Sequence, residues 1–436
     1  MISSRFDLLV SGCQILTMDD SMNIWNDGAL VVDKGKIVYC GPVEKIPEGW
    51  TFADRYDASG KIAMPPFFNS HNHAAMSIFR GLGNDLSLNA WLNQFIWPAE
   101  SRNINPDTVY LATMLSAMEM VLSGTAVFSD MYFFEEEVGR ASEEIGMRAI
   151  LGEGILDFPT PSRSTPQETF EQTRHLADKY AHHSLINVAV AAHAPYTCSP
   201  DVLSGAAELA HDLKIPANIH VAETGEEFEN LNKRYGKSPV RYLFDLGFLG
   251  SGTVIHHAIY LNPEDVDILA ETGTNVATIP NSNMKLGSGV CPVPLLIEKG
   301  INVSIGTDGP ASNNNQSMIR ELQLLGRLQK VTHGDPTILP ADQLVRMATI
   351  NGARAYGLES GLGSLEAGKQ ADFILINTDK PHWYPRFNPY TSIAYSMHSS
   401  DVESVMVNGN FILKNRLFTT IDSDKILQEI RSFVLK

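Results

Sequence analysis

The sequence is poor in features that mark several classes of protein. Its 436 residues include only four cysteines, which lie far apart with no C-x-x-C pair (Cys13, Cys40, Cys198 and Cys291). This spacing argues against a disulfide framework and against a thiolate zinc site. No apolar run approaches ~18 residues, and the first residues contain no signal-like stretch. We therefore expect a cytoplasmic protein without a membrane span.

Clusters of basic residues are also missing. The formal net charge is −17, and Lys and Arg are scattered along the chain. A field of this sign repels phosphate backbones and anionic lipids, so nucleic acid and membrane surfaces are poor candidates for partners. A small neutral or cationic molecule fits better. Hydrophobic residues make up 44% and charged residues 19%, as in an ordinary globular protein.

The chain has β-rich ends and an alternating middle. Hairpin signals at Lys34-Gly35 and Asn408-Gly409 divide β-rich runs near the two ends. We expect a small β-sandwich domain built from residues 1–63 and 366–436 together. Residues 64–365 alternate short apolar runs with longer amphipathic stretches, which predicts a TIM-like (β/α)8 barrel. The predicted barrel strands are 62–68, 126–130, 148–152, 187–193, 217–220, 253–257, 275–279 and 302–308.

Histidines and one aspartate gather at the carboxyl ends of these predicted strands. Six of the thirteen histidines occupy such positions. Barrel enzymes form their active sites at this end, so residues far apart in sequence converge there. The residues concerned are His71, His73, His193, His220, His256, His257 and Asp308.

Four of these residues are suited to binding one divalent ion. His71 and His73 are two apart on an extended segment, so both side chains leave the same face. An isolated H-x-H often only packs, but His220 and Asp308 add donors from two further strands. Three imidazoles and a carboxylate suit zinc with a position left for water. Iron, manganese or nickel accepts much the same set.

Two further residues are candidates for acid–base chemistry. Glu223 lies three residues beyond His220, where a turn would carry its carboxylate beside the ion. A surface glutamate at a helix start is the ordinary alternative. His256 and His257 are adjacent on a strand, so alternation allows only one of them to face the site. We select His257.

Seven motifs resemble, in order, those of the amidohydrolase superfamily. The resemblance covers nearly the whole chain and is strongest to the branch of methylthioadenosine and S-adenosylhomocysteine deaminases. It implies hydrolytic deamination of an adenine nucleoside (5′-methylthioadenosine, S-adenosylhomocysteine, adenosine or 5′-deoxyadenosine) through a single metal-activated hydroxide. The motifs are residues 64–73, 80–86 with 91–92, 130–133, 193–196, 220–223, 280–289 and 306–314.

The same resemblance implies a role for each site residue. The ligands of one ion would be His71, His73, His220 and Asp308, of which Asp308 also accepts the proton of the attacking water. Glu223 would be the proton shuttle and would contact substrate, and His257 would support the tetrahedral intermediate. Glu100 matches a carboxylate that binds the ribose hydroxyls, and His193 matches a substrate-binding histidine.

Two-metal members of the superfamily carry a carboxylated lysine at the end of strand four. No lysine ends that strand here, so we expect one ion per chain. We also expect the chain to form a homo-oligomer.

The end of the third strand bears on the nucleoside's 5′ group. In relatives that take S-adenosylhomocysteine, an arginine there binds the carboxylate of the substrate. Glu153 occupies that position in this chain and would repel a carboxylate, although Arg163 in the next loop would restore a partner. We expect a preference for short or uncharged 5′ groups. The alternative is that Glu153 pairs with a neighbouring arginine and never meets substrate.

Two other functions are compatible with the same fold. One is hydrolysis at another heteroaromatic carbon, such as guanine deamination or triazine dechlorination. The other is a non-catalytic scaffold, but a scaffold has no need to keep four metal ligands together with Glu223.

Overall fold

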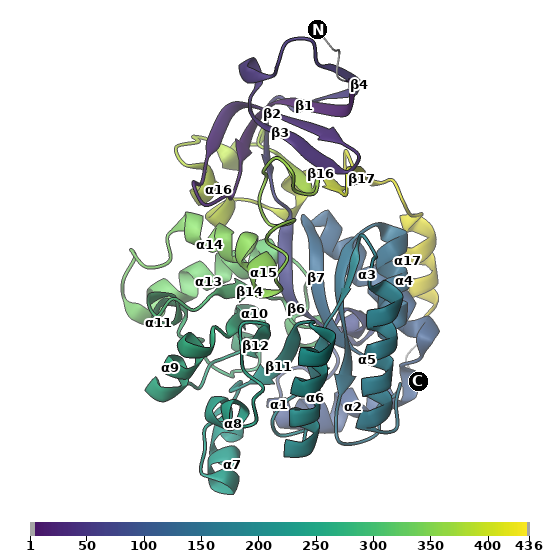
Figure 1. Ribbon diagram of the computed structural model, residues 1–436, viewed down its shortest axis with the longest axis vertical. Coiled ribbons are helices and arrows are strands. Elements are labelled where there is room, and N and C mark those ends of the chain that lie inside the picture. Colours follow the sequence, from purple (N-terminus) through teal and green to yellow (C-terminus); the bar gives the residue numbers. More distant parts are fainter. Residues whose placement is uncertain (1–4, 434–436) are drawn as a thin grey trace.

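The computed structural model describes residues 5–433, which form a barrel and a smaller β-rich part at one side of it (Figure 1). The parallel barrel strands follow the hydrogen-bonded order β14-β13-β12-β11-β10-β8-β7-β6, and β9 pairs with β8. The predicted (β/α)8 barrel is confirmed. Its strands are β6 (Phe67–Asn72), β7 (Thr125–Tyr132), β8 (Arg148–Ile155), β9 (Ile186–Val188), β10 (Val190–Ala192), β11 (Ala217–Val221), β12 (Thr253–His257), β13 (Asn275–Thr278) and β14 (Val303–Ile305).

The barrel closes where β14 meets β6. The amides of Thr307 and Asp308 donate to the carbonyl of His71, at 3.1 and 3.0 Å. Gly306 permits this approach, because a Cβ there would lie 2.7 Å from the His71 Cβ and 2.8 Å from its backbone nitrogen. The closure therefore brings two predicted metal ligands, from opposite ends of the barrel sequence, into contact.

Helices follow most of the barrel strands and cover the barrel's outside (Figure 1). Four of them are α3 (Pro106–Leu122), α5 (Pro166–Tyr180), α6 (Pro200–Leu213) and α9 (Pro263–Thr272). Asn105, Thr165 and Asn262 cap three of them at their N-termini. The others are α4 (Glu135–Ile145), α7 (Gly225–Tyr235), α8 (Pro239–Asp245), α10 (Pro280–Lys285), α11 (Val293–Glu298), α12 (Pro310–Asn313), α13 (Met318–His333), α14 (Ala341–Met347) and α15 (Ile350–Ala355).

A helical insertion separates β6 from α3 and overhangs the carboxyl end of the barrel. It consists of η2 (Ala74–Phe79), α1 (Leu88–Trp91), the π-helical η3 (Leu92–Ile96) and α2 (Trp97–Asn103). Ser87 caps α1, and the Trp91 indole donates to the Leu82 carbonyl at 3.1 Å. The insertion thus presents large apolar side chains to the site.

Both ends of the chain contribute to the second sheet. In it β5 pairs with β15 antiparallel, so that Met64 lies opposite Ile374. Its strands are β1 (Arg5–Leu16), β2 (Ile24–Asp33), β3 (Lys36–Pro42), β4 (Thr51–Asp57), β5 (Lys61–Met64), β15 (Phe373–Asn377), β16 (Val402–Val407), β17 (Asn410–Lys414) and β18 (Leu417–Phe418). The tail also reaches the barrel, since α16 (Pro389–Tyr395) contacts α13 and α14, and α17 (Ser423–Ser432) lies beside α3. Short 3-10 turns are η1 (Val43–Lys45), η4 (Pro381–Trp383) and η5 (Ser399–Asp401).

One predicted strand is divided in the structure. Residues 62–68 were expected to form a single strand, but β5 ends at Met64 in the small sheet and β6 begins at Phe67 in the barrel. Pro65 and Pro66 lie between them, and neither has an N–H to donate to a sheet. The boundary between the two sheets therefore falls at this proline pair.

The interior of the barrel is apolar at the end away from the site. Phe68, Val127, Ile150 and Val254 pack there with Tyr356, whose hydroxyl donates to the Ser70 carbonyl at 2.8 Å.

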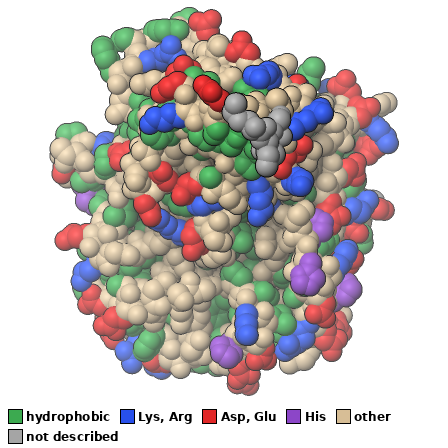
Figure 2. Space-filling model, turned by 45° about the horizontal axis from the view of Figure 1, so that its top comes forward, with side chains coloured by type: hydrophobic (Ala, Val, Ile, Leu, Met, Phe, Trp, Pro, Cys, Tyr) green, Lys and Arg blue, Asp and Glu red, His purple; other side chains and the backbone are tan. Residues whose placement is uncertain are grey.

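Among residues 5–433 no helix combines the length and apolar character needed to cross a membrane. On the face drawn in Figure 2, acidic and basic side chains are interspersed.

Candidate metal centre and active-site pocket

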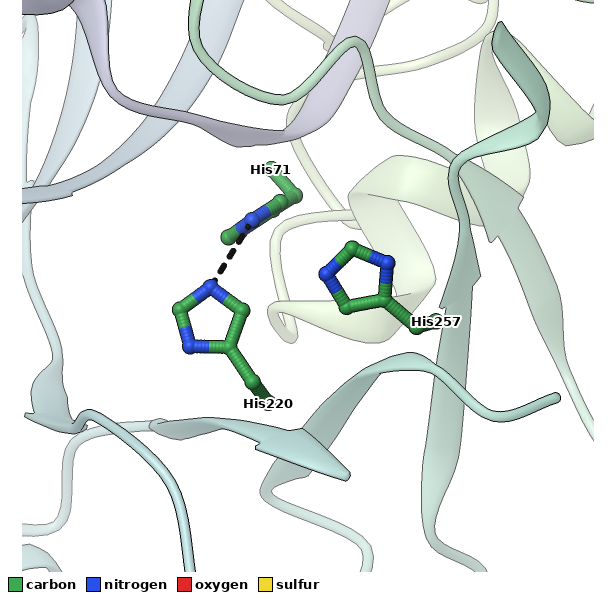
Figure 3. Close-up of side chains that lie close together, drawn as sticks. All are labelled: His71, His220 and His257. Atoms are coloured by element: carbon green, nitrogen blue, oxygen red, sulfur yellow. Dashed lines mark hydrogen bonds between the residues drawn. The ribbon is translucent and has the colours of Figure 1, made fainter. Parts of the chain in front are cut away.

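Side chains from β6, β11 and β12 converge at the carboxyl end of the barrel (Figure 3), and Asp308 joins them from the segment after β14. The Nε2 atoms of His71 and His220 lie 3.2 Å apart. The Asp308 Oδ1 lies 3.5 Å from the His71 Nε2 and 3.3 Å from the His73 Nε2. Two donors bound at about 2.0–2.1 Å to a tetrahedral zinc ion stand about 3.3 Å apart. The spacing of all three pairs therefore fits a shared ion.

Hydrogen bonds orient the histidines of this centre. The Nδ1 of His73 faces the Met131 carbonyl, and the Nδ1 of His220 lies 2.6 Å from the His193 carbonyl. A carbonyl only accepts, so each Nδ1 carries the proton and each Nε2 keeps a lone pair for a metal. Burial lowers the pKa of His71 to about 3 and holds the pKa of His220 well below its usual value. These two imidazoles are therefore neutral at physiological pH.

Asp308 is held as an anion. Its Oδ2 accepts hydrogen bonds from the Ser282 and Ser312 hydroxyls, at 2.6 and 2.9 Å. Burial on its own would raise the pKa of this carboxyl, but the neighbouring imidazoles of His71 and His73 hold it well below its ordinary value. The centre thus combines imidazole nitrogens with one carboxylate, a donor set that zinc binds.

Of the His256-His257 pair, His257 lines the pocket, as selected, whereas His256 does not line it and stacks its ring on that of His71. His256 is the register partner of His220 on the neighbouring strand, and it points into the barrel with it. Strand alternation would turn His257 outward. Instead its backbone adopts φ 68°, which swings its ring back to line the pocket. The Nδ1 of His257 lies 2.7 Å from the Asn283 Oδ1, and its Nε2 lies 3.8 Å from the Glu223 Oε2.

Glu223 lies in the turn between β11 and α7 and lines the pocket. This turn also has a left-handed residue, Ala222, at φ 53°. The amides of Ala222 and Glu223 donate to the two carboxylate oxygens of Glu227, each at 2.9 Å, which fixes the turn. Burial raises the pKa of Glu223. A carboxyl with a raised pKa beside a water site is suited to carrying a proton.

The predicted substrate-binding residues Glu100 and His193 also line the pocket. Glu100 accepts a hydrogen bond of 2.6 Å from the Tyr132 hydroxyl, and burial raises its pKa to about 7. The Nδ1 of His193 lies 2.8 Å from the Thr197 hydroxyl. The pocket thus holds acidic and imidazole groups at its base and an apolar wall from the insertion above.

Glu153 and Arg163 are placed elsewhere, which corrects the prediction that they contact substrate. On β8 the next residue, Gly154, lines the pocket, so alternation directs Glu153 to the other face. There its oxygens accept from the amides of Phe134 and Glu135, at 3.1 and 2.9 Å, at the start of α4. The Arg163 guanidinium donates to the Ser162 carbonyl at 2.7 Å. Neither side chain lines the pocket, so neither supports the argument about the 5′ group.

Several residues of the site had no predicted role. Tyr132 directly follows the motif residue Met131, and Ser282 and Asn283 lie within the motif at 280–289, so their positions were a usable signal. Trp91 and Trp97 form part of the pocket wall; Trp91 lies in the motif at 91–92, but Trp97 had no predicted role. Only the fold shows that this stretch overhangs the barrel.

Known proteins match this chain over most of its length. The family model of the amidohydrolase family matches residues 62–412. The chain belongs to the amidohydrolase family. Within this family it is similar to 5-methylthioadenosine/S-adenosylhomocysteine deaminase 1 of Syntrophus aciditrophicus, with 40% identity covering 98% of this chain and 96% of the relative. The corresponding deaminase of Desulforamulus reducens is 42% identical, with 97% of each chain covered.

A solved structure of the amidohydrolase fold is also similar. An adenosine deaminase from Xanthomonas campestris, crystallised with bound zinc, superposes with a TM-score of 0.96. Its sequence is 32% identical, and the match covers 98% of both chains. The fold and the family assignment therefore agree.

Proposed function

We propose that this amidohydrolase family member removes ammonia hydrolytically from the adenine ring of a small nucleoside, using one divalent ion. The observation that carries the proposal is the spacing of the donor atoms: the His71 Nε2 lies 3.2 Å from the His220 Nε2 and 3.5 Å from the Asp308 Oδ1, which lies 3.3 Å from the His73 Nε2. His73, His220 and Asp308 line the same pocket as Glu223. The names of the deaminase relatives and the zinc in the adenosine deaminase support the substrate class and zinc as the ion.

The residues of the pocket have separable tasks. The ion, when bound, lowers the pKa of a coordinated water from near 16 towards about 7 and so supplies hydroxide at neutral pH. Asp308 accepts the proton that this water loses. Glu223 delivers a proton to the ring nitrogen as oxygen adds to the amine-bearing carbon. The carbon–nitrogen bond then breaks: the amine takes the proton held by Asp308 and leaves as ammonia, and the remaining proton of the added oxygen passes to Glu223, which restores both carboxyl groups.

Other side chains position the reacting groups. Asn283 fixes the ring of His257, so that its Nε2 points into the pocket beside Glu223 and exchanges a hydrogen bond with the reacting oxygen. Glu100, held by Tyr132, accepts hydrogen bonds from the ribose hydroxyls. His193 contacts the substrate from the end of the fourth strand.

A nucleoside panel tests the proposal. Zinc-loaded protein is incubated with adenosine, 5′-methylthioadenosine, guanine and a chlorotriazine. The adenine-to-hypoxanthine shift in ultraviolet absorbance, the released ammonia and, for the triazine, the released chloride are recorded. We expect turnover of the adenine nucleosides at a metal content of one ion per chain. Turnover confined to guanine or the triazine would contradict the assignment.

A further inference from the structure

Three buried carboxyl groups lie close together beside the segment that carries His73. They are Asp130 on β7, Glu135 at the start of α4 and Glu153 on β8, and each residue is 0% exposed. None of the three lines the pocket, and the proposed function uses none of them. A buried carboxylate is costly unless it is paired or hydrogen-bonded, so each of these groups needs a partner.

Two of the three accept hydrogen bonds that favour their ionised forms. Glu153 accepts from two amides at the start of α4 and from the Ser162 hydroxyl. The Oδ1 of Asp130 accepts from the Ala74 amide at 2.7 Å. Donors that point at a carboxylate stabilise its charge, and the start of a helix does so most effectively. We therefore assign the negative charges of the cluster to Glu153 and Asp130.

Glu135 is the member of the cluster that lacks a donor. Among residues 5–433, no group donates a hydrogen bond of ordinary geometry to either of its carboxyl oxygens or to the Oδ2 of Asp130. The two carboxyl groups lie within hydrogen-bonding reach of each other. Burial raises the pKa of Glu135 well above its ordinary value, Asp130 and Glu153 raise it further, and the nearby Gly152 amide offsets only part of this. A proton on Glu135 supplies the donor that the pair needs.

The Asp130 side chain is connected to the metal centre through the backbone. The Met131 carbonyl faces the Nδ1 of His73, and Asp130 holds the amide of the next residue, Ala74. The Ala74 carbonyl in turn accepts a hydrogen bond of 2.7 Å from the Ser116 hydroxyl on α3. The backbone directly after His73 is therefore fixed from both sides, with β7 supplying one side.

We propose that Asp130 and Glu135 form a hydrogen-bonded pair, with Glu135 as the donor, and that this pair positions the metal ligand His73. The inference rests on the ion centre of the proposed function. Within the described residues, the groups of side chains spaced to hold an ion include neither carboxyl. Both are thus positioning residues, which act on the ion only through the His73 segment.

Zinc affinity of the full chain, measured by competition with a chromophoric chelator, tests the pair. Glu135→Gln keeps a donor for Asp130, so its affinity should stay within about twofold of native. Glu135→Met has a similar shape but no donor and should bind zinc about 10-fold more weakly, as expected when support for a ligand is lost. Asp130→Ala removes the acceptor of the Ala74 amide and should weaken binding by about 10–100-fold.

A packing control separates positioning from general loss of stability. Val138 is buried on the same helix, so Val138→Ala should lower the Tm while zinc affinity stays native. An equal loss of zinc affinity in the Val138 variant would overturn the inference, because affinity would then simply follow stability. Native affinity in both the Met variant and the Asp130 variant would overturn it as well.

Two further outcomes identify the cause of a failure. A loss of affinity in Glu135→Gln as large as that in Glu135→Met would show that the donor has no influence. Two zinc ions per native chain, with one of them lost in Glu135→Gln, would place an ion between the carboxyl groups in place of the proton. Both results contradict the pair and leave the proposed function standing, whereas a native chain that binds no zinc overturns both.

Discussion

The imidazole of His256 lies against that of His71, with ring centroids 3.9 Å apart and planes inclined by 28°. Neither ring nitrogen of His256 has a hydrogen-bond partner among residues 5–433. Its contribution to the centre is therefore made through the face of the ring, which fixes the plane of a metal ligand.

This contact predicts an effect on metal affinity. His256→Ala should weaken zinc binding by about 10–100-fold, as loss of a group supporting a ligand typically does. His256→Phe keeps a ring against His71 and should stay within a few-fold of the native affinity. Competition with a chromophoric chelator measures both. Native affinity in the Ala variant would show that the stacking has no influence on the ligand.

His220 should be indispensable for the ion. His220→Ala removes one donor from the centre, so we expect loss of both bound metal and turnover while circular dichroism stays native. His211→Ala, at an exposed position on α6, is the control and should retain both. Two tightly bound ions per native chain, or full turnover after complete metal removal, would disprove the ligand assignment.

Glu223 should matter for turnover and not for metal content. Glu223→Gln keeps the shape of the side chain but removes its titrating proton, so kcat should fall by roughly 10²-fold or more. Glu229→Gln, on the exposed face of α7, is the matched control. Near-native turnover of the Glu223 variant would mean that another group carries the proton.

The pKa of Glu100 predicts a pH dependence of ribose recognition. Burial raises this pKa to about 7, so the carboxylate is lost as the pH falls through 7. The affinity for inosine should therefore weaken from pH 8 to pH 6, by up to about tenfold per unit below the pKa. Hypoxanthine lacks the ribose and corrects for titration at the metal centre. A pH profile for inosine that is unchanged by Glu100→Gln would argue against this role.

The sequence was sufficient to predict the barrel and to select the residues that are proposed as metal ligands. Apolar runs of strand length alternate with amphipathic stretches, and the chemistry of a parallel barrel lies at the carboxyl ends of its strands. His71, His220 and Asp308 could therefore be placed together although more than 200 residues separate the first from the last. Pro65 and Pro66 also carried a signal, which would have divided the first predicted strand correctly.

The direction of side chains at strand ends could not be predicted from the sequence. The rule of alternation holds only for regular strand geometry, and His257 departs from it through its positive φ. The prediction for Glu153 failed for a related reason. A shift of one residue along β8 turns a side chain from the pocket face to the face towards α4. Neither the sign of a dihedral angle nor a register of one residue is encoded in hydrophobic periodicity.

The pairing of β5 with β15 has a consequence for how the chain is made. Met64 leaves the ribosome long before its partner Ile374, and at about 5–20 residues per second the delay is roughly 15–60 s. Throughout that interval one edge of β5 is exposed while the barrel residues emerge. Nascent chains are thus open to pairing with a neighbour on the same messenger, and a chaperone that shields this edge would raise the yield of active protein.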